Sequence, residues 1–129
     1  MPSKALEALT ESMFYVLMAL ENRPMCGIEI VDFIDTKTKQ RVQIGPATLY
    51  TILGKFEKEA YIREVEVVGR KRTYSITSKG TAAYQAEYMR LRCCVADAEN
   101  ISLEGGVYDR TERETGESAP ARAVLDVRY

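Results

Sequence analysis

The spacing of apolar residues changes from a helical to an alternating pattern near residue 60, which restricts the chain to folds that mix helix with strand. Before this point, apolar residues recur at i, i+3, i+4 and i+7 after Gly45-Pro46, where proline favours the first position of a helix. After it, apolar and polar residues alternate from Ile62 to Val68 and again from Arg72 to Ile76, as in the two strands of a hairpin with Gly69-Arg70-Lys71 at its tip. The stripe of the helix consists of Leu49, Ile52, Leu53 and Phe56, and its outward positions are Ala47, Thr48, Tyr50, Thr51, Gly54, Lys55 and Lys58.

Two helical segments are expected before this third one. The first, Thr10 to Leu20, begins at a capping residue, Thr10 or Ser12, and is apolar almost all round. Such a helix is buried on more than one side, which in a small chain favours a subunit interface. The second runs from about Gly27 to Thr36, and the basic stretch from Lys37 to Ile44 connects it to the third.

A long helix is expected after the hairpin. Thr77 fits its N-cap, and the helix should reach about Ile101. Along it, apolar residues recur at spacings of 4, 3, 4 and 3, which is the pattern of a coiled-coil seam. After Leu103 the composition is typical of a linker or tail, although Arg122 to Tyr129 alternates like an edge strand. The seam comprises Tyr84, Tyr88, Leu91, Val95 and Ala98.

Three helices, a hairpin and a long helix, in this order, make up a winged helix-turn-helix protein, whose third helix is the expected recognition helix. The expected fold class is mainly α with a small β-hairpin (α+β). We expect the winged helix-turn-helix domain at residues 9–76, a C-terminal dimerisation helix at 77–103 and a charged tail with a terminal strand at 104–129.

Several residue types that enzymes and metal sites need are missing or badly placed. The chain contains no histidine, which removes the commonest general base and most zinc sites. Its three cysteines, Cys26, Cys93 and Cys94, are odd in number and two are adjacent, so they form a poor disulfide framework. No nucleophile and base pair can be assembled. We therefore expect no catalytic residues, no cofactor and no metal.

The longest apolar run, Met13 to Leu20, has eight residues, whereas a membrane-spanning helix needs about 20. The N-terminal residues also lack the features of a signal peptide. We expect a cytoplasmic protein with no membrane partner.

Charge is unevenly distributed along the chain, although the formal net charge is only −1. Residues 1–80 contain 12 Lys+Arg and 10 Asp+Glu, whereas residues 81–129 contain 6 and 9. A nearly neutral chain can therefore present a basic face to nucleic acid. The clustered cations are Lys37, Lys39, Arg41, Arg70, Lys71 and Arg72.

Three segments of the sequence carry a family resemblance: GPATLYTILGKFEKEAYI, from Gly45 to Ile62, GRKRTYSITSKG and MCGIEI. They are similar, in this order, to the recognition-helix signature, the wing and the start of the second helix of the PadR family of transcriptional regulators. The resemblance covers about residues 9 to 101. The matching positions are Gly27, Glu29, Ile30, Thr48, Leu49, Tyr50, Leu53, Glu57, Glu59, Ile62, Gly69, Arg72, Tyr74, Thr77 and Gly80.

The resemblance implies a DNA-binding dimer held by the N-terminal helix and the long C-terminal helix, in the short form with a single C-terminal helix. Family members often respond to phenolic acids or planar hydrophobic drugs, and the drug sensors typically use tryptophan, which this chain lacks. Three positions depart from the family: Thr51 replaces proline, Gly54 a basic residue and Ala60 a glycine. Because alanine is strained in a left-handed helix cap, we expect a different turn at Ala60.

The function expected from these features is that of a ligand-responsive repressor that binds an inverted-repeat operator as a homodimer. Its partners would be double-stranded DNA, a second copy of the chain and a small aromatic or hydrophobic effector. The alternative is a winged-helix protein-interaction or small-molecule-binding module without a DNA role. The expected DNA contacts are Lys37, Lys39, Arg41, Ala47, Thr48, Tyr50, Thr51, Lys55, Arg70, Lys71 and Arg72. The expected dimer interface or effector pocket comprises Met13, Phe14, Leu17, Tyr84, Tyr88, Leu91 and Val95.

Overall fold

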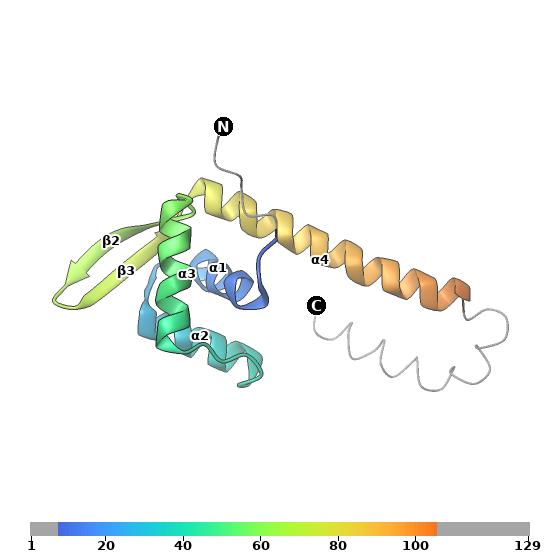
Figure 1. Cartoon of the computed structure of the whole chain (residues 1–129), viewed down its shortest axis with the longest axis horizontal. Helices are drawn as coiled ribbons and strands as arrows, with labels where there is room; N and C mark the ends of the chain where they lie inside the picture. The colour runs from blue at the N-terminus through green and yellow to red at the C-terminus, as the bar shows by residue number, and fades with distance from the viewer. Residues whose placement is uncertain (1–7, 106–129) are drawn as a thin grey trace. The chain divides into compact units, whose positions relative to one another are not determined.

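The computed structural model describes residues 8–105, which form four helices and a three-stranded sheet (Figure 1). The expected α+β winged helix-turn-helix fold with a long C-terminal helix is confirmed. The elements are α1 (Glu11–Asn22), β1 (Met25–Cys26), α2 (Gly27–Thr38), α3 (Pro46–Lys58), β2 (Ile62–Val68), β3 (Lys71–Ile76) and α4 (Ser78–Gly105).

The chain divides into two compact units after Met89. The first contains α1, α2, α3, the sheet and the beginning of α4, and the second begins at Arg90 on α4. The strand predicted at Arg122 to Tyr129, with the rest of the tail from residue 106 onward, lies outside the described residues.

The sheet contains one strand that the sequence did not predict. Its strands are antiparallel in the order β1-β3-β2, with Met25 opposite Tyr74 and Cys26 opposite Thr73. A strand of two residues is too short to show an alternating pattern, which is why only the hairpin was predicted. Because α2 begins at Gly27, directly after β1, this pairing fixes the start of α2 beside the hairpin.

The hairpin of β2 and β3, which we call the wing, extends away from the helices of the first unit (Figure 1). Lys71 already belongs to β3, and Gly69 in the turn has a left-handed φ of 62° that glycine adopts without strain. The pairing register shifts between Glu64 and Glu66, where Val65 is the extra residue of a bulge. Burial therefore alternates only as far as Glu64, and Val67, like Val65, is exposed.

Helices α1 and α4 begin at expected capping residues. The Thr10 hydroxyl accepts a hydrogen bond from the Met13 N–H at 3.1 Å, and the Thr77 hydroxyl accepts one from the Gly80 N–H at 3.1 Å. Three helices extend beyond their predicted ends, and α1 continues to Asn22. Helix α2 continues to Thr38, so Lys37 lies on the helix, and α4 continues to Gly105.

The core of the first unit is formed by α1, α2, α3 and the sheet, and the predicted stripe of α3 is confirmed as part of it. Phe56 has an exposed fraction of 0%, and Leu53 has 1%. The fully or almost fully buried side chains with the largest volumes are Phe56, Leu17, Leu20, Met25, Ile30, Ile34, Leu53 and Val16.

Helix α3 ends in the left-handed turn that the sequence analysis did not expect. Ala60 has a φ of 62°, the conformation that glycine usually supplies at this position. The Ala60 N–H donates to the Glu57 carbonyl at 3.0 Å, and the Tyr61 N–H donates to the Phe56 carbonyl at 2.8 Å. These two hydrogen bonds form a Schellman motif, so the expectation of a different turn was wrong.

Candidate nucleic-acid interface

The outer face of α3 presents polar side chains to solvent. All five residues predicted on this helix as DNA contacts are exposed, and Tyr50 has an exposed fraction of 62%. The opposite face is buried, so the helix is held by its apolar stripe while the polar face stays accessible. From Pro46 to Lys55 the helix carries no acidic side chain that would repel phosphate. The five residues are Ala47, Thr48, Tyr50, Thr51 and Lys55.

Helix α3 crosses the start of α2 at a glycine. A Cβ atom at Gly27 would lie 3.3 Å from Leu49 Cδ2 and 3.8 Å from the Tyr50 hydroxyl oxygen. The small residue therefore lets the two helices approach closely and places the Tyr50 hydroxyl near the first turn of α2. The same turn carries the Glu29 carboxylate, which accepts the Cys26 N–H at 2.9 Å and closes the start of the helix.

A shallow hollow of about 360 Å³ runs between the start of α1 and the exposed face of α3. It adds two hydroxyl groups, of Thr10 and Ser12, to those of Thr48 and Thr51 on α3. Sequence reasoning assigned Thr10 and Ser12 only as helix-capping candidates, because nothing in their spacing relates them to α3. The hollow is lined by Thr10, Ser12, Met13, Ala47, Thr48, Thr51, Ile52 and Lys55.

The three cations predicted before α3 have different surroundings. Lys37 is exposed on α2, and Lys39 is exposed at the left-handed end of that helix. The Arg41 guanidinium instead donates to the Glu11 carboxylate at 2.9 Å and to the Tyr15 hydroxyl at 3.0 Å. The hydrogen bond to Glu11 raises the pKa of Arg41. In this structure Arg41 therefore ties the α2–α3 connection to α1.

The wing carries its cations at and beside the tip. Arg70, Lys71 and Arg72 are all exposed, and the Arg72 guanidinium also lies 3.1 Å from the Glu64 carboxylate on the neighbouring strand. Arg72 is thus partly neutralised within the chain. Val67 and Val68 are also exposed at this end of the wing.

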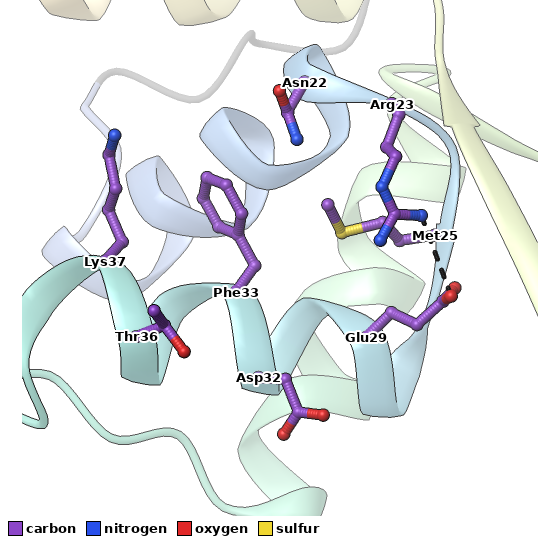
Figure 2. A pocket seen from close by; sticks show the side chains of 8 residues that line it. All are labelled: Asn22, Arg23, Met25, Glu29, Asp32, Phe33, Thr36 and Lys37. Atoms are coloured by element: carbon purple, nitrogen blue, oxygen red, sulfur yellow. Dashed lines mark ion pairs between the residues drawn. The ribbon is translucent and has the colours of Figure 1, made fainter.

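A second hollow, of about 370 Å³, lies between the end of α1 and the outer side of α2. Figure 2 shows the Phe33 ring at its centre and the Arg23–Glu29 ion pair, with 3.7 Å between nitrogen and oxygen, at one end. The Cys26 N–H, which donates to Glu29 at 2.9 Å, lowers the pKa of Glu29. Sequence reasoning did not identify this hollow, whose mixed charges are unsuited to the DNA backbone. It is lined by Asn22, Arg23, Met25, Glu29, Asp32, Phe33, Thr36 and Lys37.

The residues predicted for a dimer interface or effector pocket separate into three groups: two core residues, two residues of the second unit and a set of aromatic residues. Met13 and Leu17 have exposed fractions of 6% and 0%. They are core residues of the single chain and offer almost no surface to a second chain, although the edge of Met13 lines the hollow beside α3. Leu91 and Val95 are partly exposed on the part of α4 that belongs to the second unit.

Phe14 and Tyr84 form the aromatic part of that predicted set. Their rings stack with centroids 5.1 Å apart and an interplanar angle of 19°. Partial burial raises the pKa of Tyr84. Tyr88, one turn further along α4, has an exposed fraction of 38%. The structure thus places aromatic surface where α1 meets the beginning of α4.

No helix within residues 8–105 is long and apolar enough to span a membrane. In the same range, no three His, Cys, Asp or Glu side chains are grouped so that they could hold a metal ion. Cys26 is buried, whereas Cys93 and Cys94 are exposed on α4, and all three are free.

Comparison with known proteins agrees with this architecture. The model of the transcriptional regulator PadR-like family matches residues 16–86. An uncharacterized protein X of Lysinibacillus sphaericus is 32% identical over 94 residues, which cover 70% of this chain and 85% of that protein.

Two solved structures extend the comparison. A transcriptional regulator from Clostridium thermocellum is 26% identical with a TM-score of 0.63, covering 69% of this chain and 87% of its own. A PadR family transcription regulator from Clostridium difficile shares the fold at 16% identity, with a TM-score of 0.59 and coverage of 73% and 99%. The family model spans more than half of this chain, and the chain therefore belongs to the PadR-like family of transcriptional regulators.

Proposed function

We propose that this chain is a ligand-responsive repressor that binds an inverted-repeat operator as a homodimer. Members of its family are transcriptional regulators and not enzymes, which implies DNA-binding regulation. The observation that carries the proposal is the exposed polar face of α3 beside a wing with exposed cations. A helix of this kind enters the major groove, and the wing contacts the adjacent backbone.

The roles of the side chains follow from their chemistry. Thr48, Thr51 and Tyr50 offer hydroxyl groups that can both donate and accept hydrogen bonds, as base edges require. Lys55, Arg70 and Lys71 are exposed cations and contact phosphate without reading sequence. Lys37 and Lys39 are further phosphate contacts in this proposal, although Lys37 also lines the mixed-charge hollow beside α2. Arg41 and Arg72 are exposed cations whose phosphate contacts compete with their ion pairs to Glu11 and Glu64.

Dimerisation is supported by the apolar residues along α4. Leu91 and Val95 occupy seam positions of the predicted coiled-coil pattern and remain partly exposed in the single chain. Tyr88 and the stacked Phe14 and Tyr84 add aromatic surface on the first unit, where a small aromatic or hydrophobic effector would bind. With two recognition helices related by a two-fold axis, the half-sites lie about 34–36 Å apart, one turn of DNA.

The DNA-binding part of the proposal is tested by two alanine variants. Thr48→Ala should weaken binding to the selected operator by about 1–3 kcal/mol and change which base is preferred, because a base contact is lost. Arg70→Ala should weaken operator and scrambled DNA alike and reduce the slope of log affinity against log salt by about 0.9, because one phosphate contact is lost. The measurement is a titration of both DNAs with each protein at several salt concentrations.

Selection of DNA from a random pool provides the starting operator. Recovery of no inverted repeat would contradict the repressor proposal. If an operator is recovered but Arg70→Ala changes neither affinity nor salt slope, the wing is not a DNA contact. The exposed valines of the wing would then favour the alternative, a protein-interaction module.

The dimer is tested by placing the same charge on and off the seam. Leu91→Glu should shift the protein to monomer at micromolar concentration in sedimentation, because it places a carboxylate within an apolar contact. Arg90→Glu is the matched control on the neighbouring position and should leave the dimer largely intact. A monomeric wild-type chain, or equal effects of the two variants, would contradict this interface.

A further inference from the structure

The hydroxyl group of Thr77 links the end of α3 to the beginning of α4. This hydroxyl lies 2.7 Å from the Ala60 carbonyl oxygen, to which it donates, and 3.1 Å from the Tyr61 carbonyl oxygen. It also accepts the Gly80 N–H at 3.1 Å. The side chain therefore caps α4 and at the same time holds the turn that follows α3.

Backbone contacts reinforce the same junction. The Thr77 N–H donates to the Tyr61 carbonyl at 2.9 Å. A Cβ atom at Gly80 would lie only 2.1 Å from the Tyr61 carbonyl oxygen, so the first turn of α4 rests directly on this peptide group. Tyr61 itself is buried and its ring lies 5.7 Å from that of Phe56, on the core side of α3.

The turn is also restrained from the α3 side. Ala60 is fixed in a left-handed conformation by the Schellman hydrogen bonds, and its carbonyl oxygen accepts the Thr77 hydroxyl. Movement of the start of α4 against α3 must break either the Thr77 hydrogen bonds or the Schellman motif. All of these contacts lie within the first unit.

We propose that Thr77 is a positioning residue that sets the angle between the recognition helix α3 and the start of α4. The inference rests on the proposed function, because α4 carries the proposed dimer seam. In such a dimer, the angle at this junction determines the separation and rotation of the two recognition helices. Thr77 therefore determines which spacing between half-sites the dimer accepts, without contacting DNA.

Three substitutions separate this role from simple helix capping. Thr77→Ser keeps both the donor and the acceptor. Thr77→Asp keeps an acceptor for the Gly80 N–H, because aspartate is a good N-cap, but it cannot donate to the Ala60 carbonyl when ionised. Thr77→Val removes both functions at nearly constant size. The aspartate variant remains informative if the valine variant fails to fold, because it retains the cap.

The readout is affinity for inverted repeats that share half-sites and differ in spacing by single base pairs, with a single half-site as control. Wild type and Thr77→Ser should prefer one spacing by about tenfold over its neighbours. Thr77→Asp should lose or shift that preference while its affinity for the single half-site and its far-UV circular dichroism stay unchanged. An unchanged spacing preference in Thr77→Asp would overturn the inference, whereas failure of the wild type to bind any inverted repeat would overturn the proposed function.

Discussion

Replacing Gly80 with alanine is expected to destabilise the first unit by about 3 kcal/mol, at the upper end of what overpacking costs. The new methyl group would lie 2.1 Å from the Tyr61 carbonyl oxygen and 2.9 Å from the Tyr61 carbonyl carbon. These are backbone atoms held by Thr77, so neither can move without disturbing the junction. The gain of about 1 kcal/mol in helix propensity is too small to offset this clash.

Gly54→Ala is the matched control, because Gly54 is also a helical glycine. Its Cβ atom would meet nothing within 4 Å, so the substitution should stabilise the chain by about 0.5–1 kcal/mol. Urea unfolding of the two variants measures both free energies. Stabilisation of both variants would show that helix propensity, and not the contact with Tyr61, determines the effect at Gly80.

Phe56→Ala is expected to cost about 3–5 kcal/mol, which is the usual range for removing a large aromatic side chain from a core. Phe56 has an exposed fraction of 0% and packs against Tyr61 at 5.7 Å between ring centroids. The loss leaves a cavity beneath α3, the helix that carries the candidate DNA contacts. Thermal or urea unfolding should therefore show a large loss of stability, and DNA binding should fall with the folded fraction.

Tyr50→Ala on the opposite face of α3 separates stability from binding. Tyr50 is 62% exposed, so its removal should change the free energy of unfolding by less than about 0.5 kcal/mol. Its affinity for operator DNA should nevertheless fall. A stable Phe56→Ala variant, or a Tyr50→Ala variant as unstable as Phe56→Ala, would contradict the assignment of the two faces.

Much of the fold could be predicted from the sequence because its apolar residues follow clear periods. The stripe of Leu49, Ile52, Leu53 and Phe56 identifies the buried face of α3, and the complementary exposed face follows from it. The caps at Thr10 and Thr77 could be predicted for a similar reason, since a hydroxyl residue before a helix satisfies a free N–H group. The outward positions of α3 were therefore identified before the structure.

Contacts between residues far apart in sequence could not be predicted in the same way. The Arg41 side chain reaches Glu11 across 30 residues, and Thr10 and Ser12 line the hollow beside α3, although no periodic pattern relates them. The burial of Leu17 within one chain also escaped prediction, because an all-apolar helix can face either its own core or a second subunit. At Ala60 the local steric preference of the residue predicted the wrong turn. The hydrogen bonds of the turn and of Thr77 hold alanine in the left-handed conformation that it normally avoids.

The bulge in the wing affects how the protein behaves when it is concentrated. In the described part of the sheet, β2 is an edge strand, and an edge offers unpaired backbone groups to any other chain. Val65, Val67 and Val68 are exposed on this strand, and their apolar side chains would stabilise such pairing. The bulge at Val65 interrupts the regular row of backbone groups, and the charge of Glu66 beside it opposes close pairing with another copy. We therefore expect the irregular strand to resist edge-to-edge pairing while its valines remain accessible.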